Sequence, residues 1–217
     1  MELQEIKEFI TTAREQAEER NFVQSVDVVA SLKDLDLNSP EHKVDAYVVL
    51  PHSLGKQKKV AALVAPDTKD VVEGIVDAVI PQSEFDSYQS DSKKAKTLAK
   101  EYDYFMAQAD IMPKVATVFG RYLGPRGKMP NPKLGSIINP KSNIQTIYER
   151  LQNTAHLKAK KDPVVQVKVG NEDMDDDALA ENILTLYDSL LENLINERNN
   201  VKDIYLKLTM GAPVSML

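Results

Sequence analysis

The chain has 217 residues, enough for one large domain or two small ones, and its 42% hydrophobic content predicts a buried core. No apolar stretch approaches the roughly 20 residues that span a membrane, and the charged N-terminus lacks a signal-sequence pattern, so we expect a soluble, intracellular protein. The absence of cysteine excludes disulfide frameworks, thiolate zinc sites and cysteine nucleophiles, and the net charge of −6 argues, taken alone, against nucleic acid as a partner.

The first quarter of the chain reads as a helix followed by two strands. Apolar residues recur at helical spacing from Leu3 to Ala17, which predicts an amphipathic helix over Glu2 to Arg20. Alternating, β-branched segments predict strands at Ser25 to Leu32 and at Ala46 to Leu50.

The middle of the chain alternates between strand and helix patterns, which is typical of a small parallel-sheet domain. Apolar runs predict strands, at Val60 to Ala65 and Tyr104 to Ala107. Helical spacing predicts the intervening helices, at Val71 to Val79, Met112 to Leu123 and Ile144 to Leu151. His52 to Lys59 and the basic stretch Lys158 to Lys161 then look like crossover segments between two domains.

The last quarter again shows the strand and helix patterns of an α+β domain. Strand patterns at Val164 to Val169 and Ile204 to Thr209 flank a helix marked by leucines between Leu179 and Leu194. We therefore expect a mixed α/β and α+β protein of two domains. The outer one is an α+β sandwich of residues 1–58 and 154–217, and the inserted one is a small parallel-sheet, Rossmann-like α/β domain of residues 59–153.

The loop from Gly120 to Gly135 is rich in glycine and proline and carries four cations, Arg121, Arg126, Lys128 and Lys133. Together with Lys114 and Lys141 they belong to a segment, Ile111 to Tyr148, that contains no Asp or Glu, so the local field opposes the negative mean. A rigid cationic loop suits contacts with phosphate or a partner; the alternative is a solvated loop whose charges only aid solubility. The loop is not a Walker motif, because Met129 stands where Ser or Thr is needed.

Near the C-terminus, Lys207 to Pro213 reads as a strand that ends in a turn with exposed backbone. Such a strand end can lie on the shallow minor groove of RNA, where sugar hydroxyls and base edges are within reach of short polar groups. The alternative is a plain strand and turn.

Three motifs, Leu50-Pro-His-Ser-Leu-Gly-Lys56, Leu123-Gly-Pro-Arg-Gly-Lys-Met-Pro-Asn-Pro132 and Thr209-Met-Gly211, resemble those of the large-subunit ribosomal protein one family, the stalk protein beside the tRNA exit site. The resemblance spans nearly the whole chain. The segment Leu32 to Leu37 and the direct start at Met1 look more like archaeal than bacterial members. Ala212 departs from the family pattern, in which proline usually follows the Thr-Met-Gly motif directly.

The resemblance implies a structural protein without enzymatic activity, cofactor or metal, monomeric away from the ribosome. Its implied partners are large-subunit ribosomal RNA, deacylated tRNA leaving the exit site, and the leader of its own messenger RNA, whose translation it would repress. The residues implied to line one RNA-facing surface are Phe22, Ser25, Asp27, Lys168, Gly170, Thr209, Met210 and Gly211. We expect the four cations of the Gly120 to Gly135 loop to form a second contact with RNA or tRNA.

Two rival functions remain open from the residues alone. The inserted domain could belong to a phosphate- or nucleotide-binding enzyme, although the sequence offers no nucleophile elbow and no His-Asp pair. The acidic helix from Ala178 to Arg198 could serve a protein-interaction adaptor. His42, His52 and His156 lie in separate segments, and the carboxylates from Glu172 to Asp177 are better explained as a helix cap than as a cation site.

Overall fold

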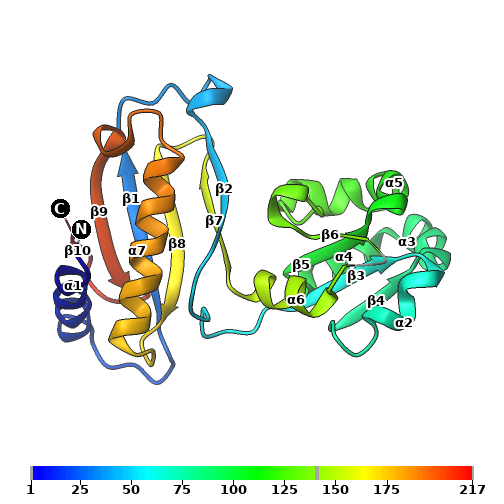
Figure 1. The fold of residues 1–217 in the computed structure, drawn as a ribbon, viewed down its shortest axis with the longest axis horizontal. Coiled ribbons are helices and arrows are strands. Elements are labelled where there is room, and N and C mark those ends of the chain that lie inside the picture. Colours follow the sequence, from blue (N-terminus) through cyan, green and yellow to red (C-terminus); the bar gives the residue numbers. More distant parts are fainter. Residues whose placement is uncertain (1, 140–141, 217) are drawn as a thin grey trace. The chain divides into compact units, whose positions relative to one another are not determined.

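A computed structural model describes residues 2–139 and 142–216 of the chain (Figure 1). The protein divides into two compact units. Residues 1–56 and 153–217 form the outer unit, and residues 57–152 form the inserted unit. Among the described residues, no helix combines the length and the apolar character needed to cross a membrane.

The outer unit is built on a four-stranded antiparallel sheet with strand order β10-β9-β1-β8. Its strands are β1 (Ser25–Leu32), β8 (Val164–Asn171), β9 (Val201–Leu208) and β10 (Val214–Ser215). Strand β1 pairs with β8 on one side and with β9 on the other, so segments from both ends of the chain meet in one sheet. A second, two-stranded antiparallel sheet joins β2 (Val44–Val49) to β7 (Thr154–Ala159).

Helices α1 (Leu3–Glu15) and α7 (Asp176–Glu192) pack against the inward side chains of these strands in one hydrophobic core. The carboxylate of Asp175 caps α7 by accepting from the N–H of Asp177 at 3.2 Å. Arg14 on α1 pairs with Asp176 at 2.6 Å, and Lys7 pairs with Asp177. The acidic run therefore caps one helix and attaches another to it.

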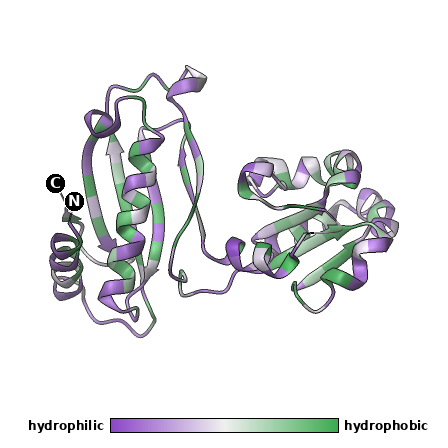
Figure 2. Ribbon diagram, in the orientation of Figure 1, coloured by the Kyte–Doolittle hydropathy of each residue, from purple (hydrophilic) through white to green (hydrophobic). Residues whose placement is uncertain are grey.

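The inserted unit is built on a four-stranded parallel sheet with strand order β4-β3-β5-β6. Its strands are β3 (Val60–Val64), β4 (Ala78–Pro81), β5 (Tyr104–Gln108) and β6 (Ile137–Ile138). Its α-helices are α2 (Lys69–Val72), α3 (Phe85–Ser90), α4 (Ser92–Glu101), α5 (Met112–Leu123) and α6 (Ile144–Gln152). Every residue of β3 is buried, as expected of a strand covered on both faces, and its hydrophobic colouring is evident in Figure 2.

The predicted fold class is confirmed: an antiparallel sheet is made from both chain ends and a parallel sheet from the middle. Two predicted helices are too long. Helix α1 ends at Glu15 rather than at Arg20. The helix predicted over Val71 to Val79 stops at Val72, because Gly74 adopts a left-handed φ of 88°, and Val79 instead belongs to β4.

Strand β7 is the principal element that the sequence analysis missed. The stretch from Lys158 to Lys161 was expected to be a crossover segment, but Lys158 lies within β7 and is paired with Asp45. The strand shows the period of two that could have revealed it, since Ala155, Leu157 and Ala159 are buried while the residues between them are partly or fully exposed.

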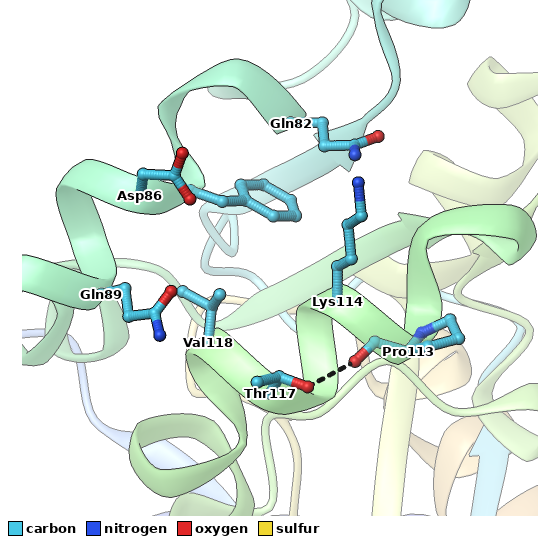
Figure 3. A pocket seen from close by; sticks show the side chains of 8 residues that line it. Gln82, Asp86, Gln89, Pro113, Lys114, Thr117 and Val118 are labelled. Atoms are coloured by element: carbon cyan, nitrogen blue, oxygen red, sulfur yellow. Dashed lines mark hydrogen bonds between the residues drawn. The ribbon is translucent and has the colours of Figure 1, made fainter.

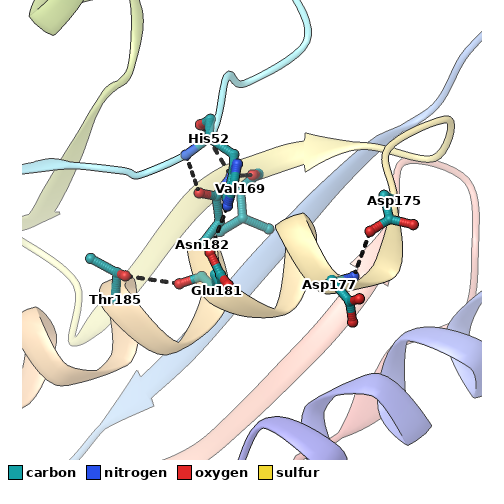
Figure 4. A network of polar contacts seen from close by, with 7 residues as sticks. All are labelled: His52, Val169, Asp175, Asp177, Glu181, Asn182 and Thr185. Atoms are coloured by element: carbon teal, nitrogen blue, oxygen red, sulfur yellow. Dashed lines mark hydrogen bonds and ion pairs between the residues drawn. The ribbon is translucent and has the colours of Figure 1, made fainter.

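A buried amide on α7 ties two other elements of the outer unit together (Figure 4). The side chain of Asn182 is fully buried; its Oδ1 accepts from the N–H of His52 at 3.0 Å, and its Nδ2 donates to the carbonyl of Val169 at 2.9 Å. The carboxylate of Glu181, the residue before Asn182 on α7, lies 2.6 Å from the ring of His52. The segment that follows β2 is thus fixed to α7 and β8.

We expect Asn182→Ala to lower the free energy of unfolding by about 1–3 kcal/mol, because it leaves a buried N–H and a buried carbonyl without partners. Urea unfolding followed by circular dichroism measures the change. Asn193→Ala is the matched control, since the Asn193 amide is exposed and donates only to Ser189, at 2.7 Å; it should change the value by less than about 0.5 kcal/mol. Equal effects of the two substitutions would contradict this role of Asn182.

Candidate RNA-binding site

Strand register places four of the predicted contact residues, Ser25, Asp27, Lys168 and Thr209, on one side of the outer unit's sheet. Asp27 on β1 stands directly opposite Lys168 on β8 and opposite Lys207 on β9. Residues opposite one another in an antiparallel sheet share a face, as do residues two apart on one strand. The outward side chains therefore form one surface, here called the open face, made of Ser25, Asp27, Lys168, Lys207 and Thr209.

Two hydroxyl groups mark the end of the open face where β1 begins. Thr209 Oγ1 accepts from the N–H of Ser25 at 3.0 Å, and the two side-chain hydroxyls lie 3.0 Å apart. The N–H of Thr209 also donates to the carbonyl of Ser25 at 3.0 Å, which extends the β1–β9 ladder by one residue pair. Both hydroxyls are held in fixed positions and retain capacity for a further hydrogen bond.

Asp27 is the carboxylate at the centre of the open face. Partial burial raises its pKa above the ordinary value of 3.8, while Lys168 and Lys207 act in the opposite direction. Within the described residues, no donor reaches this carboxylate within hydrogen-bond distance and no cation lies within 4 Å. An acceptor that burial makes costly and that has no internal partner is suited to a donor supplied by a ligand, such as a sugar hydroxyl or a guanine amino group.

The cations around Asp27 are suited to phosphate. Burial lowers the pKa of Lys168, whereas Asp27 raises it and the nearby Lys56 lowers it. Lys168 and Lys207 form no ion pair with any described residue. Their ammonium groups are therefore available for phosphate oxygens, and Lys207 and Lys56 add positive charge that the sequence analysis did not assign to the site.

Two large apolar side chains are exposed at the same end of the sheet, where β1 begins and β9 has ended. Phe22 is 51% exposed and Met210 is 60% exposed. The buried side chain of Gln24 holds the backbone of Met210: its Oε1 accepts from the N–H of Met210 at 3.0 Å, and its backbone N–H donates to Glu172 at 2.7 Å. Exposed apolar groups beside polar ones suit stacking or packing against nucleotides.

The two glycines of the predicted set have different positions. Gly211 is partly exposed in the turn after β9, and its N–H donates to the carbonyl of Leu208 at 3.0 Å. Gly170 is buried, contrary to the expectation that it lines the surface. A Cβ there would lie 2.5 Å from Met174 Sδ and 2.8 Å from Leu179 Cδ1, so this glycine permits close packing of β8 against α7.

The second predicted set lies in the inserted unit, in and after α5. Arg121, Arg126 and Lys133 are exposed. Lys128 differs, because its Nζ donates to the carbonyl of Tyr102 at 2.6 Å and burial lowers its pKa. Three of the four cations are therefore presented to solvent, while Lys128 holds the loop to the unit. Lys141, which the sequence analysis counted with them, lies outside the described residues.

The described residues of the inserted unit, 57–139 and 142–152, do not offer the phosphate site that the enzyme hypothesis requires. In open parallel sheets, nucleotides bind outside the carboxyl ends of the strands where strand order reverses, which here is between β3 and β5. Gln108 fills this position with a buried side chain. Its Oε1 accepts from the N–H of Ala65 at 3.1 Å and from the hydroxyl of Thr68 at 2.9 Å.

A pocket of about 450 Å³ does lie between α3 and α5 (Figure 3). Its lining residues are Gln82, Phe85, Asp86, Gln89, Pro113, Lys114, Thr117 and Val118. None is a glycine, and none belongs to the cationic loop. The hydroxyl of Thr117 already donates to the carbonyl of Pro113 at 3.0 Å. This pocket therefore lacks the cradle of backbone N–H groups typical of nucleotide phosphates.

Comparison with known proteins agrees with the resemblance drawn from the motifs. The model of the Ribosomal protein L1p/L10e family matches residues 13–212. The chain is 37% identical to large ribosomal subunit protein uL1 of Thermococcus kodakarensis, over 98% of this chain and 97% of the relative. It is 40% identical to the uL1 protein of Methanothermobacter thermautotrophicus, over 99% of each chain.

We expect Gly170→Ala to lower the free energy of unfolding by about 1–3 kcal/mol, since the added methyl group overpacks the contact between β8 and α7. Gly120→Ala is the control. A Cβ at Gly120 meets nothing within 4 Å, and in the interior of α5 it should stabilise the chain by up to about 1 kcal/mol. Urea unfolding of both variants provides the measurement, and a harmless Gly170→Ala would refute the packing role.

A second prediction concerns pH. Because the folded state raises the pKa of Asp27, the ionised carboxylate destabilises the fold at pH values above its pKa, and this effect disappears as pH falls below the ordinary value of 3.8. Asp27→Asn should therefore be more stable than the wild type at neutral pH, by a margin that shrinks as pH falls towards 4.

Asp36→Asn tests the opposite sign. Hydrogen bonds from Asn38 and Ser39 lower the pKa of Asp36, so its ionised form stabilises the fold at neutral pH and that stabilisation is lost on acidification. This variant should be less stable than the wild type at pH 7, with a difference that also shrinks as pH falls. Unfolding midpoints measured between about pH 2 and pH 7 report both trends, since the Asp27 difference is lost above and the Asp36 difference below the ordinary value of 3.8. A stabilising Asp36→Asn or a destabilising Asp27→Asn at neutral pH would count against the assignments.

Proposed function

The chain belongs to the Ribosomal protein L1p/L10e family, and from that premise we propose that its open face binds ribosomal RNA directly. Membership makes the protein a structural constituent of the large subunit of the cytoplasmic ribosome and not an enzyme. The alternative of a nucleotide-binding enzyme is therefore abandoned. The proposal concerns how the protein attaches to the subunit.

The observation that carries the proposal is the composition of the open face. It combines fixed hydroxyls at Ser25 and Thr209, an acceptor at Asp27 that no described residue satisfies, and cations on both flanking strands. Sugar hydroxyls, base edges and phosphates are the groups that RNA displays across its shallow minor groove, and each has a counterpart here. The low net charge does not oppose binding, since the field at the face is set by local cations.

The family also suggests two further activities, which we include in the proposal. The exposed Arg121, Arg126 and Lys133 would contact deacylated tRNA as it leaves the exit site, since a rigid cationic loop is suited to a sugar-phosphate backbone. The open face would also bind the leader of the protein's own messenger RNA and repress its translation. Such repression requires only that the leader present the same donors, acceptors and phosphates as the ribosomal site. Away from the ribosome the protein would be a monomer.

Substitutions on the open face test direct binding. Thr209→Ala removes a fixed hydroxyl and Met210→Asp places a carboxylate near phosphate, so each should weaken binding to a large-subunit ribosomal RNA fragment by about 1–3 kcal/mol. Fluorescence anisotropy at constant salt measures the affinity. Unfolding midpoints of the variants separate a binding defect from a folding defect.

Two controls sharpen the test. Thr209→Ser keeps the hydroxyl and should retain affinity to within about 0.5 kcal/mol. Ile195→Asp introduces the same carboxylate at another exposed apolar residue of the outer unit. Ile195 is 52% exposed and follows the C-terminal end of α7, outside the open face, so this variant should keep the wild-type affinity. Wild-type affinity in both Thr209→Ala and Met210→Asp would overturn the proposed surface.

A further inference from the structure

A groove of the outer unit lies between β7 and the start of β8. Two adjoining cavities, of about 310 and 590 Å³, share the residues Lys158, Asp162 and Val164. Lys160 and Lys161 complete the first cavity, and His156 and Gln166 complete the second. The three lysines come from β7 and the turn that connects it to β8. We call this feature the lysine groove.

The lysine groove is continuous with the open face. Gln166 on β8 stands opposite Val29 on β1, one outward position along the sheet from the pair formed by Lys168 and Asp27. Val164, Gln166 and Lys168 are alternate residues of one strand and therefore point to the same side. At about 3.3 Å per residue, the groove begins at Gln166, roughly 7 Å from Lys168 along β8, and reaches Val164 at roughly 13 Å. A polymer bound at the open face can reach it without leaving the surface of the unit.

The charge of the groove is locally positive in a protein with a net charge of −6. Lys160 is paired with Asp45 at 2.6 Å, and the same carboxylate lies 2.7 Å from the ring of His156. Burial alone would raise the pKa of Asp45, but hydrogen bonds from Lys160 and His156 outweigh it and hold the pKa below its ordinary value. Asp45 is thus occupied as an ionised partner.

The remaining two lysines have no such partner. Among the residues that the structure describes, neither Lys158 nor Lys161 forms an ion pair, and Asp162 is the one carboxylate that lines the groove itself. The ring of His156 is stacked on Tyr47, with centroids 4.3 Å apart, which fixes one wall. Free ammonium groups beside a rigid wall are suited to successive anions along a chain.

We propose that the lysine groove binds backbone phosphates of the same RNA that occupies the open face, with Lys158 and Lys161 each neutralising a phosphate. The inference rests on the proposed function, because RNA is chosen on account of the continuity between groove and face. It adds a sequence-independent contact near Val164, where β8 begins; Thr209 lies at the other end of the sheet, near the last residue of β8. The open face supplies recognition, and the groove supplies register and salt-dependent affinity.

The test compares salt dependence in full-length variants. Lys158→Gln combined with Lys161→Gln removes two phosphate contacts, each of which contributes about 0.7–0.9 to the slope of log affinity against log salt. Between roughly 50 and 200 mM salt, the affinity for a labelled large-subunit ribosomal RNA fragment should therefore drop by a factor about ten times larger in the wild type than in the double variant. Lys96→Gln with Lys100→Gln is the matched control, with the same change in net charge at exposed positions of α4 in the inserted unit. It should reproduce the wild-type slope.

The outcomes separate this inference from the function on which it rests. A reduced slope in the groove variant alone, with Thr209→Ala lowering affinity at an unchanged slope, supports both. If the groove variant and the control share the wild-type slope while Thr209→Ala still weakens binding, the groove proposal is overturned and the proposed function stands. If the wild type prefers the fragment no more than an unrelated RNA of equal length, both fall. The groove proposal also falls if the double variant loses affinity for an acidic peptide while its affinity for the RNA is unchanged.

Discussion

The pairing of β1 with both β8 and β9 is the constraint on which the outer unit depends. It fixes Asp27 between Lys168 and Lys207 and brings Ser25 to Thr209, residues that are 184 positions apart in the sequence. No single segment carries the candidate site. A register slip of one residue on any of the three strands would turn the outward set into the core and destroy the core and the site together.

The two sides of this sheet have different roles: one forms the core, and the other presents polar groups to solvent. The inward side packs on α1 and α7 in a tightly packed core. At Gly170 this core has no space for even one added methyl group. The outward side keeps groups that would be costly in a core, among them the carboxylate of Asp27, which has no hydrogen-bonding partner in the described part of the chain. Rigid packing on one side holds the polar groups of the other in fixed positions, so little conformational entropy is lost when a ligand binds.

Much of the fold could be predicted from the sequence, because the spacing of apolar residues along each segment indicates whether it forms a strand or a helix. The strands β1, β3, β5, β8 and β9 and the helices α5 and α7 each follow from apolar spacing. Helix α2 was overextended because the pattern in Val71 to Val79 ignores the left-handed turn at Gly74. Strand β7 was missed because its outward lysines read as a linker. At the candidate site, motif resemblance supplied residue types, but the role of Lys207 depends on register across strands, and that of Gln24 on a buried hydrogen bond to Met210; neither is visible in a linear pattern.

The same topology has a consequence for how the protein is made. The inserted unit contains its own strands and helices within one continuous segment and can fold as soon as that segment leaves the ribosome. Strand β1 is synthesised among the first residues but gains its partners only when β8 and β9 emerge, which at about 5–20 residues per second takes on the order of ten seconds or more. During that interval its hydrogen-bonding edges are unpaired and exposed to association with other chains. The surface that we assign to RNA thus comes into existence only after β8 and β9 have been made, and a nascent chain that lacks these strands has no means of engaging its target.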